Sequence, residues 1–197
     1  MATQEERRAQ TRDALLEAGA TLFAARGVAG ASVDAIAREA GRTSGALYDH
    51  FGSKEGLLFA LLESWVDDAA VVIAAEQAAA TTLDEWLAAM WHAVSDPPSG
   101  DGRWLALEHE LWAYAAQSDR ARRYLARRYQ AAWDGIDAVA TQWTGPAGTV
   151  RIGPAVIGLL FGLEMMRRVD PAAVTDAVAV AALRGVVTTA ADRSPSR

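Results

Sequence analysis

The sequence lacks cysteine, contains a single lysine, and has only six prolines and no long uncharged apolar run. Because there is no cysteine, disulfide bonds, thiol catalysis and cysteine-ligated zinc sites are excluded. The most apolar late stretches, residues 152–166 and 172–191, carry charged side chains and do not suit a bilayer span of ~20 apolar residues. The N-terminal residues are polar and charged, unlike a secretory signal peptide. We therefore expect a soluble, cytoplasmic protein without a membrane partner.

An excess of positive charge is also missing. The net charge is −6, and the first 55 residues contain seven basic and eight acidic side chains. Proteins that attract nucleic acid through their overall charge are basic, so this composition argues mildly against such a partner. Any contact with DNA must therefore depend on the local geometry of a few side chains.

Sustained alternation of apolar and polar residues, which would indicate β-strands, is absent as well. Most prolines fall at breaks between segments with helical periodicity, as expected for helix boundaries. The pattern predicts an all-α fold of about nine helices. These are expected at residues 4–26, 33–40, 44–51, 54–76, 83–94, 103–116, 120–143, 152–168 and 172–188.

The most informative segment, residues 32–54, indicates two short helices joined by a tight turn and followed by the start of a third. Ala37 supplies the small residue needed where the two helices touch, and Gly41 tolerates the positive φ of the turn. The expected helix caps are Ser32, Thr43 and Ser53. The inner faces are expected to pack Val33, Ile36, Leu47 and Phe51 on Leu15, Leu22 and Phe23. The segment predicts a helix-turn-helix.

The second short helix, residues 44–51, has small residues at its N-terminal end, which let its backbone approach the major groove of DNA closely. Tyr48 can donate its hydroxyl proton to a phosphate or stack on sugar and base edges, and His50 can also reach a phosphate. Lys54 adds a positive charge beside the free backbone N–H groups at the start of the next helix. The alternative is an ordinary three-helix cluster that binds no DNA.

The segments LFAARG, SVDAIAREAG and ALYDHFGSKEGLL resemble the N-terminal domain of the tetracycline-repressor (TetR) family of bacterial transcription regulators, over about residues 10–62. The resemblance implies a helix-turn-helix DNA-binding domain at residues 1–53 and a helical ligand-binding and dimerisation domain at residues 54–197. It also implies that a double-stranded DNA operator is the partner. The implied contact residues are Ser32, Arg42, Thr43, Ser44, Gly45, Tyr48, His50 and Lys54. Asp49 could accept from a cytosine amine or face solvent, so the target sequence stays open.

Aromatic residues concentrate in the middle of the chain, where six of the seven tryptophans lie between Trp86 and Trp143. Aromatic and methionine stripes on helices are more often plain core than pocket lining. The resemblance favours a pocket for a small, bulky effector that is largely apolar, or cationic if Glu108 and Glu110 are buried. The candidate ligand-binding residues are Trp86, Met90, Trp104, Leu107, Glu108, Leu111, Tyr129, Trp133, Phe161 and Met165.

The last two expected helices, residues 152–168 and 172–188, combine apolar residues with small ones. The small residues that permit close helix approach are Gly158, Gly162, Ala177 and Ala181. Two such helices can pair with the same two of a second copy in a four-helix interface, or they can cover the core of a monomer. The resemblance favours a homodimer through these helices, with an interface of ~2,000 Å² or more.

Sequence patterns of catalysis are missing, since no HExxH, GxSxG or phosphate-loop pattern occurs. The run Glu108-His109-Glu110 cannot converge on one metal ion, because adjacent helical residues point about 100° apart. We expect no enzymatic activity, catalytic residue, metal or cofactor. The prediction is a ligand-responsive transcriptional regulator, a repressor that binds a pseudo-palindromic operator as a dimer and is released by its effector. The alternatives are an activator of the same fold and a helical interaction module without sequence-specific DNA binding.

Overall fold

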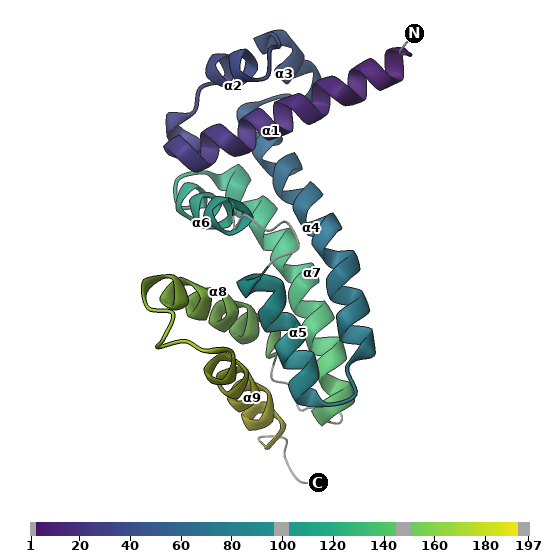
Figure 1. Ribbon diagram of the computed structural model, residues 1–197, viewed down its shortest axis with the longest axis vertical. Coiled ribbons are helices and arrows are strands. Elements are labelled where there is room, and N and C mark those ends of the chain that lie inside the picture. The colour runs from purple at the N-terminus through teal and green to yellow at the C-terminus, as the bar shows by residue number, and fades with distance from the viewer. Residues whose placement is uncertain (1–2, 97–102, 145–150, 193–197) are drawn as a thin grey trace. The chain divides into compact units, whose positions relative to one another are not determined.

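A computed structural model of the protein describes residues 3–96, 103–144 and 151–192. All regular elements in these residues are α-helices, which confirms the expected fold class (Figure 1). In chain order they are α1 (Gln4–Gly30), α2 (Val33–Glu39), α3 (Ser44–Phe51), α4 (Lys54–Ala79), α5 (Leu83–Ser95), α6 (Arg103–Ala115), α7 (Asp119–Thr144), α8 (Gly153–Val169) and α9 (Asp176–Asp192). None of the helices in the described ranges combines the length and apolar character needed to cross a membrane.

The chain forms two compact units. Unit 1 comprises residues 1–68 and 101–125, and unit 2 comprises residues 69–100 and 126–197. Unit 1 contains α1, α2, α3 and α6 with the first parts of α4 and α7, whereas unit 2 contains α5, α8, α9 and the remaining parts of α4 and α7. The predicted functional boundary after residue 53 stays a prediction, and the compact unit that holds the first three helices also includes α6.

The short helices of unit 1 begin at hydroxyl side chains. Ser32 Oγ accepts from the N–H of Ala35 at 3.2 Å, and Thr43 Oγ1 accepts from the N–H of Ala46 at 3.2 Å. Ser53 Oγ accepts from the N–H of Gly56 at 3.0 Å. Each cap satisfies a backbone N–H that the helix leaves unpaired, which stabilises it by about 1 kcal/mol. All three predicted caps are confirmed.

The core of unit 1 joins α1 to α2, α3, α4 and α6. Its fully buried aliphatic and aromatic side chains are Leu15, Phe23, Ile36, Leu47, Leu57, Leu58, Leu105, Leu107 and Leu111. Each large apolar side chain that is removed from water contributes about 1.5–3 kcal/mol. The helices approach closely, because a Cβ added to Gly19 of α1 would lie 3.0 Å from Leu57 Cδ2 of α4. This packing holds α2 and α3 on the side of α1 (Figure 1).

The first helix is interrupted near its end. Gly27 has φ 69° and ψ 166°, a conformation that favours glycine, and one further turn follows up to Gly30. The predicted stop at Gly27 therefore coincides with a kink inside α1. Glu110 of α6 accepts from the N–H of Val28 at 3.1 Å, and a Cβ at position 27 would lie 2.8 Å from Glu110 Oε2. A carboxylate of α6 thus satisfies a backbone donor that the kink exposes.

Unit 2 packs α5, α8 and α9 against one another (Figure 1). Its buried core includes Trp86, Leu87, Trp91, Val156, Leu160, Ala179, Leu183 and Val187. Trp91 Nε1 donates to Asp176 Oδ1 at 2.7 Å and so ties α5 to the first turn of α9. The buried carboxylate of Glu164 pairs with Arg167 at 2.6 Å and Arg168 at 3.0 Å. These ion pairs lie within α8, and Arg167 also donates to the carbonyl of Ser95 at the end of α5.

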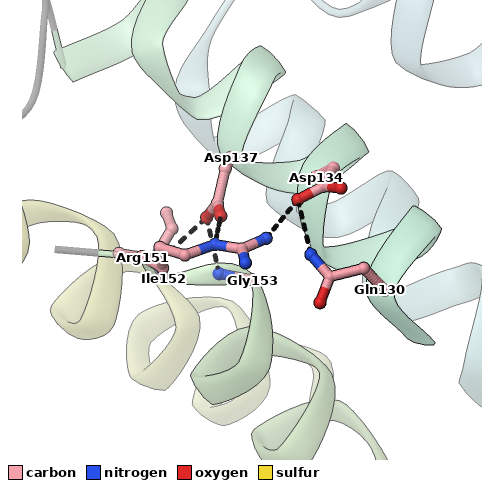
Figure 2. Close-up of polar contacts among 6 residues, drawn as sticks. All are labelled: Gln130, Asp134, Asp137, Arg151, Ile152 and Gly153. Atoms are coloured by element: carbon pink, nitrogen blue, oxygen red, sulfur yellow. Dashed lines mark hydrogen bonds and ion pairs between the residues drawn. The ribbon is translucent and has the colours of Figure 1, made fainter. Parts of the chain in front are cut away.

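The start of α8 is held by a carboxylate of α7, as Figure 2 shows. Asp137 Oδ1 accepts from the N–H groups of Ile152 at 2.9 Å and Gly153 at 2.7 Å, while Oδ2 accepts from Arg151 Nε at 3.0 Å. Arg151 also pairs with Asp134. Ile152 provides no side-chain cap, so Asp137 performs that role from a neighbouring helix. A Cβ on Gly153 would lie 2.6 Å from Trp133 Cα, so only glycine fits this close approach.

The helix boundaries agree with the predicted ones to within four residues, and one of the largest shifts is at the start of α9 (Asp176 rather than residue 172). Asp170 Oδ1 accepts from the N–H groups of Ala172 at 3.0 Å and Ala173 at 3.3 Å, which holds the segment after Pro171 in a turn. Thr175 then accepts from the N–H of Val178 at 3.4 Å. The expected start at residue 172 was wrong because the Asp-Pro turn delays the helix.

Candidate nucleic-acid interface

The turn between α2 and α3 is a Schellman motif centred on a glycine. Gly41 has φ 62°, the N–H of Gly41 bonds to the carbonyl of Arg38 at 3.1 Å, and the N–H of Arg42 bonds to the carbonyl of Ala37 at 2.8 Å. Ala37 is buried at the helix contact. The predicted roles of Ala37 and Gly41 are therefore confirmed, and the angle at which α3 leaves α2 is fixed by backbone hydrogen bonds.

One face of α3 is buried and the opposite face is exposed. Leu47 lies fully in the core, whereas the neighbouring Tyr48 has 54% of its surface exposed. Gly45 is exposed, and a Cβ there would meet only Thr43 Oγ1 at 3.7 Å, an ordinary contact. The fold therefore does not require glycine at position 45, but its absence of a side chain leaves the backbone of α3 open to a close partner.

The serine and threonine hydroxyl groups among the predicted DNA contacts form two kinds of hydrogen bond. Ser32 and Thr43 accept from backbone N–H groups, and each hydroxyl keeps its own proton available for donation to a phosphate. Ser44 instead donates its proton to Asp34 Oδ1 of α2. The caps are thus free to donate outward, while Ser44 joins α3 to α2.

Arg42 and His50 flank α3. Arg42 is exposed, and it donates through Nε to Thr11 Oγ1 at 3.2 Å and through Nη1 to the carbonyl of Gly41 at 3.1 Å. Partial burial of His50, followed by the nearby guanidinium groups of Arg8 and Arg12, lowers its pKa below the ordinary 6.5, while Asp49 opposes this shift. Neutral pH therefore favours an uncharged His50, which can bind a phosphate as a hydrogen-bond donor.

Lys54 lies in a different setting from the one that the sequence suggested. Its ammonium group donates to the carbonyls of Val28 at 2.7 Å and Ala31 at 3.0 Å, and it lies 3.5 Å from that of Ala29. These carbonyls belong to the end of α1, where a cation complements the helix dipole. Contact between Lys54 and DNA stays a prediction, and its observed role is to join the start of α4 to the end of α1.

Comparison with known proteins identifies this segment. Residues 15–61 match the family described as "Bacterial regulatory proteins, tetR family". The chain carries a TetR-family DNA-binding domain. The transcriptional repressor KstR2 of Rhodococcus jostii is 47% identical over 57 residues, which make up 29% of this chain and 28% of that protein. The regulator SrpR of Pseudomonas putida is 46% identical over 55 residues, 28% of this chain and 26% of that protein. Both relatives are matched over less than a third of their own length.

Solved structures extend the TetR likeness beyond the N-terminal domain. A TetR-family regulator from Rhodococcus sp. has 27% identity and a TM-score of 0.70, with 92% of this chain and 98% of that chain covered. A transcriptional regulator from Saccharomonospora viridis, solved in complex with choline, has 19% identity and a TM-score of 0.70 over 91% and 96% of the two chains. At that identity, the second likeness concerns the fold alone.

The predicted ligand-binding residues divide between the two units. In unit 1, Leu107, Glu108 and Leu111 are buried. In unit 2, Trp86, Met90 and Phe161 are buried, Met165 is 43% exposed, and the side chains of Tyr129 and Trp133 are half-buried. The side chain of Trp104 lies outside the described residues. The ligand-binding role of these residues stays a prediction.

Three of the unit 2 aromatic residues lie close together. The rings of Tyr129 and Trp133 stack with their centroids 6.1 Å apart, and the edge of the Phe161 ring approaches Tyr129 at 6.5 Å. The indole N–H of Trp133 is buried without a hydrogen-bond partner. A buried donor without a partner is uncommon in proteins, so this cluster has one unused polar group among apolar rings.

Proposed function

We propose that this TetR-family protein is a DNA-binding transcriptional regulator, a repressor that binds a pseudo-palindromic operator as a homodimer. The observation that carries the proposal is the outward face of α3. This helix is fixed by the Schellman turn at Gly41, capped by Thr43, and presents the half-exposed Tyr48 beside the bare backbone of Gly45. A helix of this kind can lie in the major groove with its N-terminal residues at the base edges.

The dimeric part of the proposal is supported by the outer faces of α8 and α9. Met166 and Val169 of α8 and Val178 of α9 are large apolar side chains exposed in this single chain. Gly162 of α8 and Gly185 of α9 have open space where a Cβ would stand. Exposed apolar residues beside small ones suit a helical partner, and a second copy would bring two α3 helices to half-sites ~34–36 Å apart.

We further propose that the repressor responds to a small effector, which is bulky and either largely apolar or cationic. Within unit 1, α6 contacts both segments that lead into the DNA-reading helices. Glu110 holds the N–H of Val28 near the end of α1, and Tyr114 donates to Glu55 in the first turn of α4 at 2.8 Å. A displacement of α6 would therefore change both ends of the helix-turn-helix. The effector lowers operator affinity only if it binds the two arrangements with different affinities.

The experiment begins with selection from a random duplex library, which should enrich an inverted repeat. On the enriched duplex, Tyr48→Ala should weaken binding about tenfold or more, because a hydrogen bond to a charged phosphate contributes about 1.5–3 kcal/mol. Tyr48→Phe removes only the hydroxyl and separates its contribution from that of the ring. Circular dichroism should show unchanged folding, since Tyr48 lies outside the core. Selection that enriches no sequence would favour the alternative of an interaction module without sequence-specific DNA binding.

A further inference from the structure

DNA binding depends chiefly on cations that neutralise phosphates, and this protein has few cations placed for that task. The chain has a net charge of −6, and its single lysine is committed to carbonyl groups of α1. If the protein binds DNA as proposed above, its phosphate contacts must come from other side chains near α3. Arginine is suited to them, because its guanidinium stays charged and can bind phosphate through two N–H groups.

The N-terminal half of α1 reaches both ends of α3. At the N-terminal end, Arg42 donates to Thr11 Oγ1 of α1 at 3.2 Å. At the C-terminal end, the guanidinium carbon of Arg12 lies 5.5 Å from the centroid of the Phe51 ring. Side chains of residues 11 and 12 of α1 therefore contact residues near both ends of this short helix, within unit 1.

Arg8 extends the same face of α1. It lies four residues before Arg12, so the two side chains are neighbours on the helix surface. Both are exposed, and both lie near enough to His50 of α3 to affect its titration. Acidic side chains also lie in this region: Glu5, Glu6 and Asp13 on the same half of α1, Asp49 on α3, and Asp34 of α2, which accepts from Ser44. The region therefore has no excess of basic residues, and the three guanidinium groups are local sites of positive charge beside α3.

We propose that Arg8 and Arg12 of α1, together with Arg42, form a phosphate-binding strip beside α3. The strip binds the sugar–phosphate backbone that borders the groove entered by α3. It supplies affinity without sequence preference, while the exposed face of α3 reads the bases. The ordinary alternative is that these arginines form a solvated helix face, with Arg12 stacked on Phe51.

The test measures the dissociation constant at a series of salt concentrations by fluorescence anisotropy, with the selected duplex and with a scrambled duplex of equal length. Arg8→Gln and Arg12→Gln should each reduce the slope of log affinity against log salt by about 0.9 for every phosphate released. Binding to the two duplexes should weaken by similar factors, because phosphate contacts carry no sequence information. Arg12→Lys keeps the charge and should retain most of the slope.

Arg26→Gln is the matched control, since Arg26 is exposed on the same helix about 21 Å further along. It should leave the slope unchanged. The strip is refuted if the Arg8→Gln/Arg12→Gln double variant keeps the wild-type slope, or if Arg26→Gln lowers it equally. Arg8→Gln guards against a folding defect, because the ring contact with Phe51 involves Arg12 alone. If selection enriches no sequence, that result counts against the proposed regulator but not against the strip. The strip can still be tested with the scrambled duplex.

Discussion

Lys54 and the arginines of α1 show how the environment of a cation can differ from what the sequence suggests. Lys54 follows α3 in a family pattern that implies a DNA contact, yet its donors are used by the carbonyls of Val28 and Ala31. Arg8 and Arg12 belong to no motif and were not among the predicted contacts. Their positions become clear only once α1 lies beside α3, more than 30 residues later in the chain. The one signal in the sequence is their spacing of four residues, which places both side chains on the same face of the first helix.

His50 gives a prediction at the residue scale. Burial and the nearby Arg8 and Arg12 lower its pKa below 6.5, so the unfolded chain takes up this proton more readily than the folded protein. The contribution of His50 to stability is therefore present above that pH and is lost as the pH falls below it. Relative to His50→Gln, the wild-type protein should become progressively less stable as the solution is acidified through pH 6.5.

Urea unfolding of both proteins at several pH values measures this difference. The other two histidines are present in both proteins, so their contributions cancel from the comparison. The charged groups that influence His50 are Arg8 and Arg12 on α1 and Asp49 on α3. A difference in unfolding free energy that stays constant with pH, or that favours the wild type in acid, would contradict the lowered pKa of His50.

At the scale of helices, the sequence was informative wherever local chemistry determines the structure. The bounds of α3 were predicted at both ends, because Thr43 caps the helix and Gly52 ends it with φ 71°. The sequence predicts the end of the first helix at Gly27, where the structure has a kink, because a glycine is common both at the end of a helix and at a kink within one. The start of α9 was missed since the carboxylate of Asp170 holds a turn that helical periodicity alone does not reveal.

The start of α8 gives a prediction at the same scale. Asp137→Ala should lower the free energy of unfolding by about 1–2 kcal/mol, because two backbone N–H groups of α8 lose their acceptor. Asp134→Ala is the matched control, since Asp134 pairs with the same Arg151 but is exposed, and such a pair contributes less than about 1 kcal/mol. Thermal unfolding of both variants provides the comparison. Equal losses would mean that Arg151, and not the start of α8, accounts for the stabilisation.

The proposed assembly can be tested at the scale of the whole molecule. The wild-type protein should sediment as a dimer, and Gly162→Arg should weaken the dimer by about tenfold or more, because it brings bulk and like charges to a face that meets its own copy. Gly135→Arg makes the same change at an exposed, open glycine of α7. Analytical ultracentrifugation should find Gly135→Arg dimeric. A monomeric wild type, or a Gly162→Arg protein that remains fully dimeric, would exclude α8 as the interface.

The sequence indicated the functional class but not the way the chain is divided in space. The helix-turn-helix is encoded by a continuous segment, so its motif could be recognised in the sequence. The hydrogen-bond partners of α6, in contrast, lie far away in the chain: Tyr114 bonds to Glu55, 59 residues away, and Glu110 to Val28, 82 residues away. The candidate effector residues show the same limit, because aromatic stripes on α5, α6 and α7 look alike in sequence and fall into different compact units.

The discontinuous make-up of unit 1 matters for anyone who wishes to transplant its DNA specificity. Leu107 and Leu111 of α6 belong to the same core of unit 1 as the helix-turn-helix. A chimeric regulator joined after residue 53 would lack these α6 residues. The acceptor protein would then have to supply other apolar side chains to cover the core. A graft that carries residues 103–125 along with the first 68 would bring its native support with it.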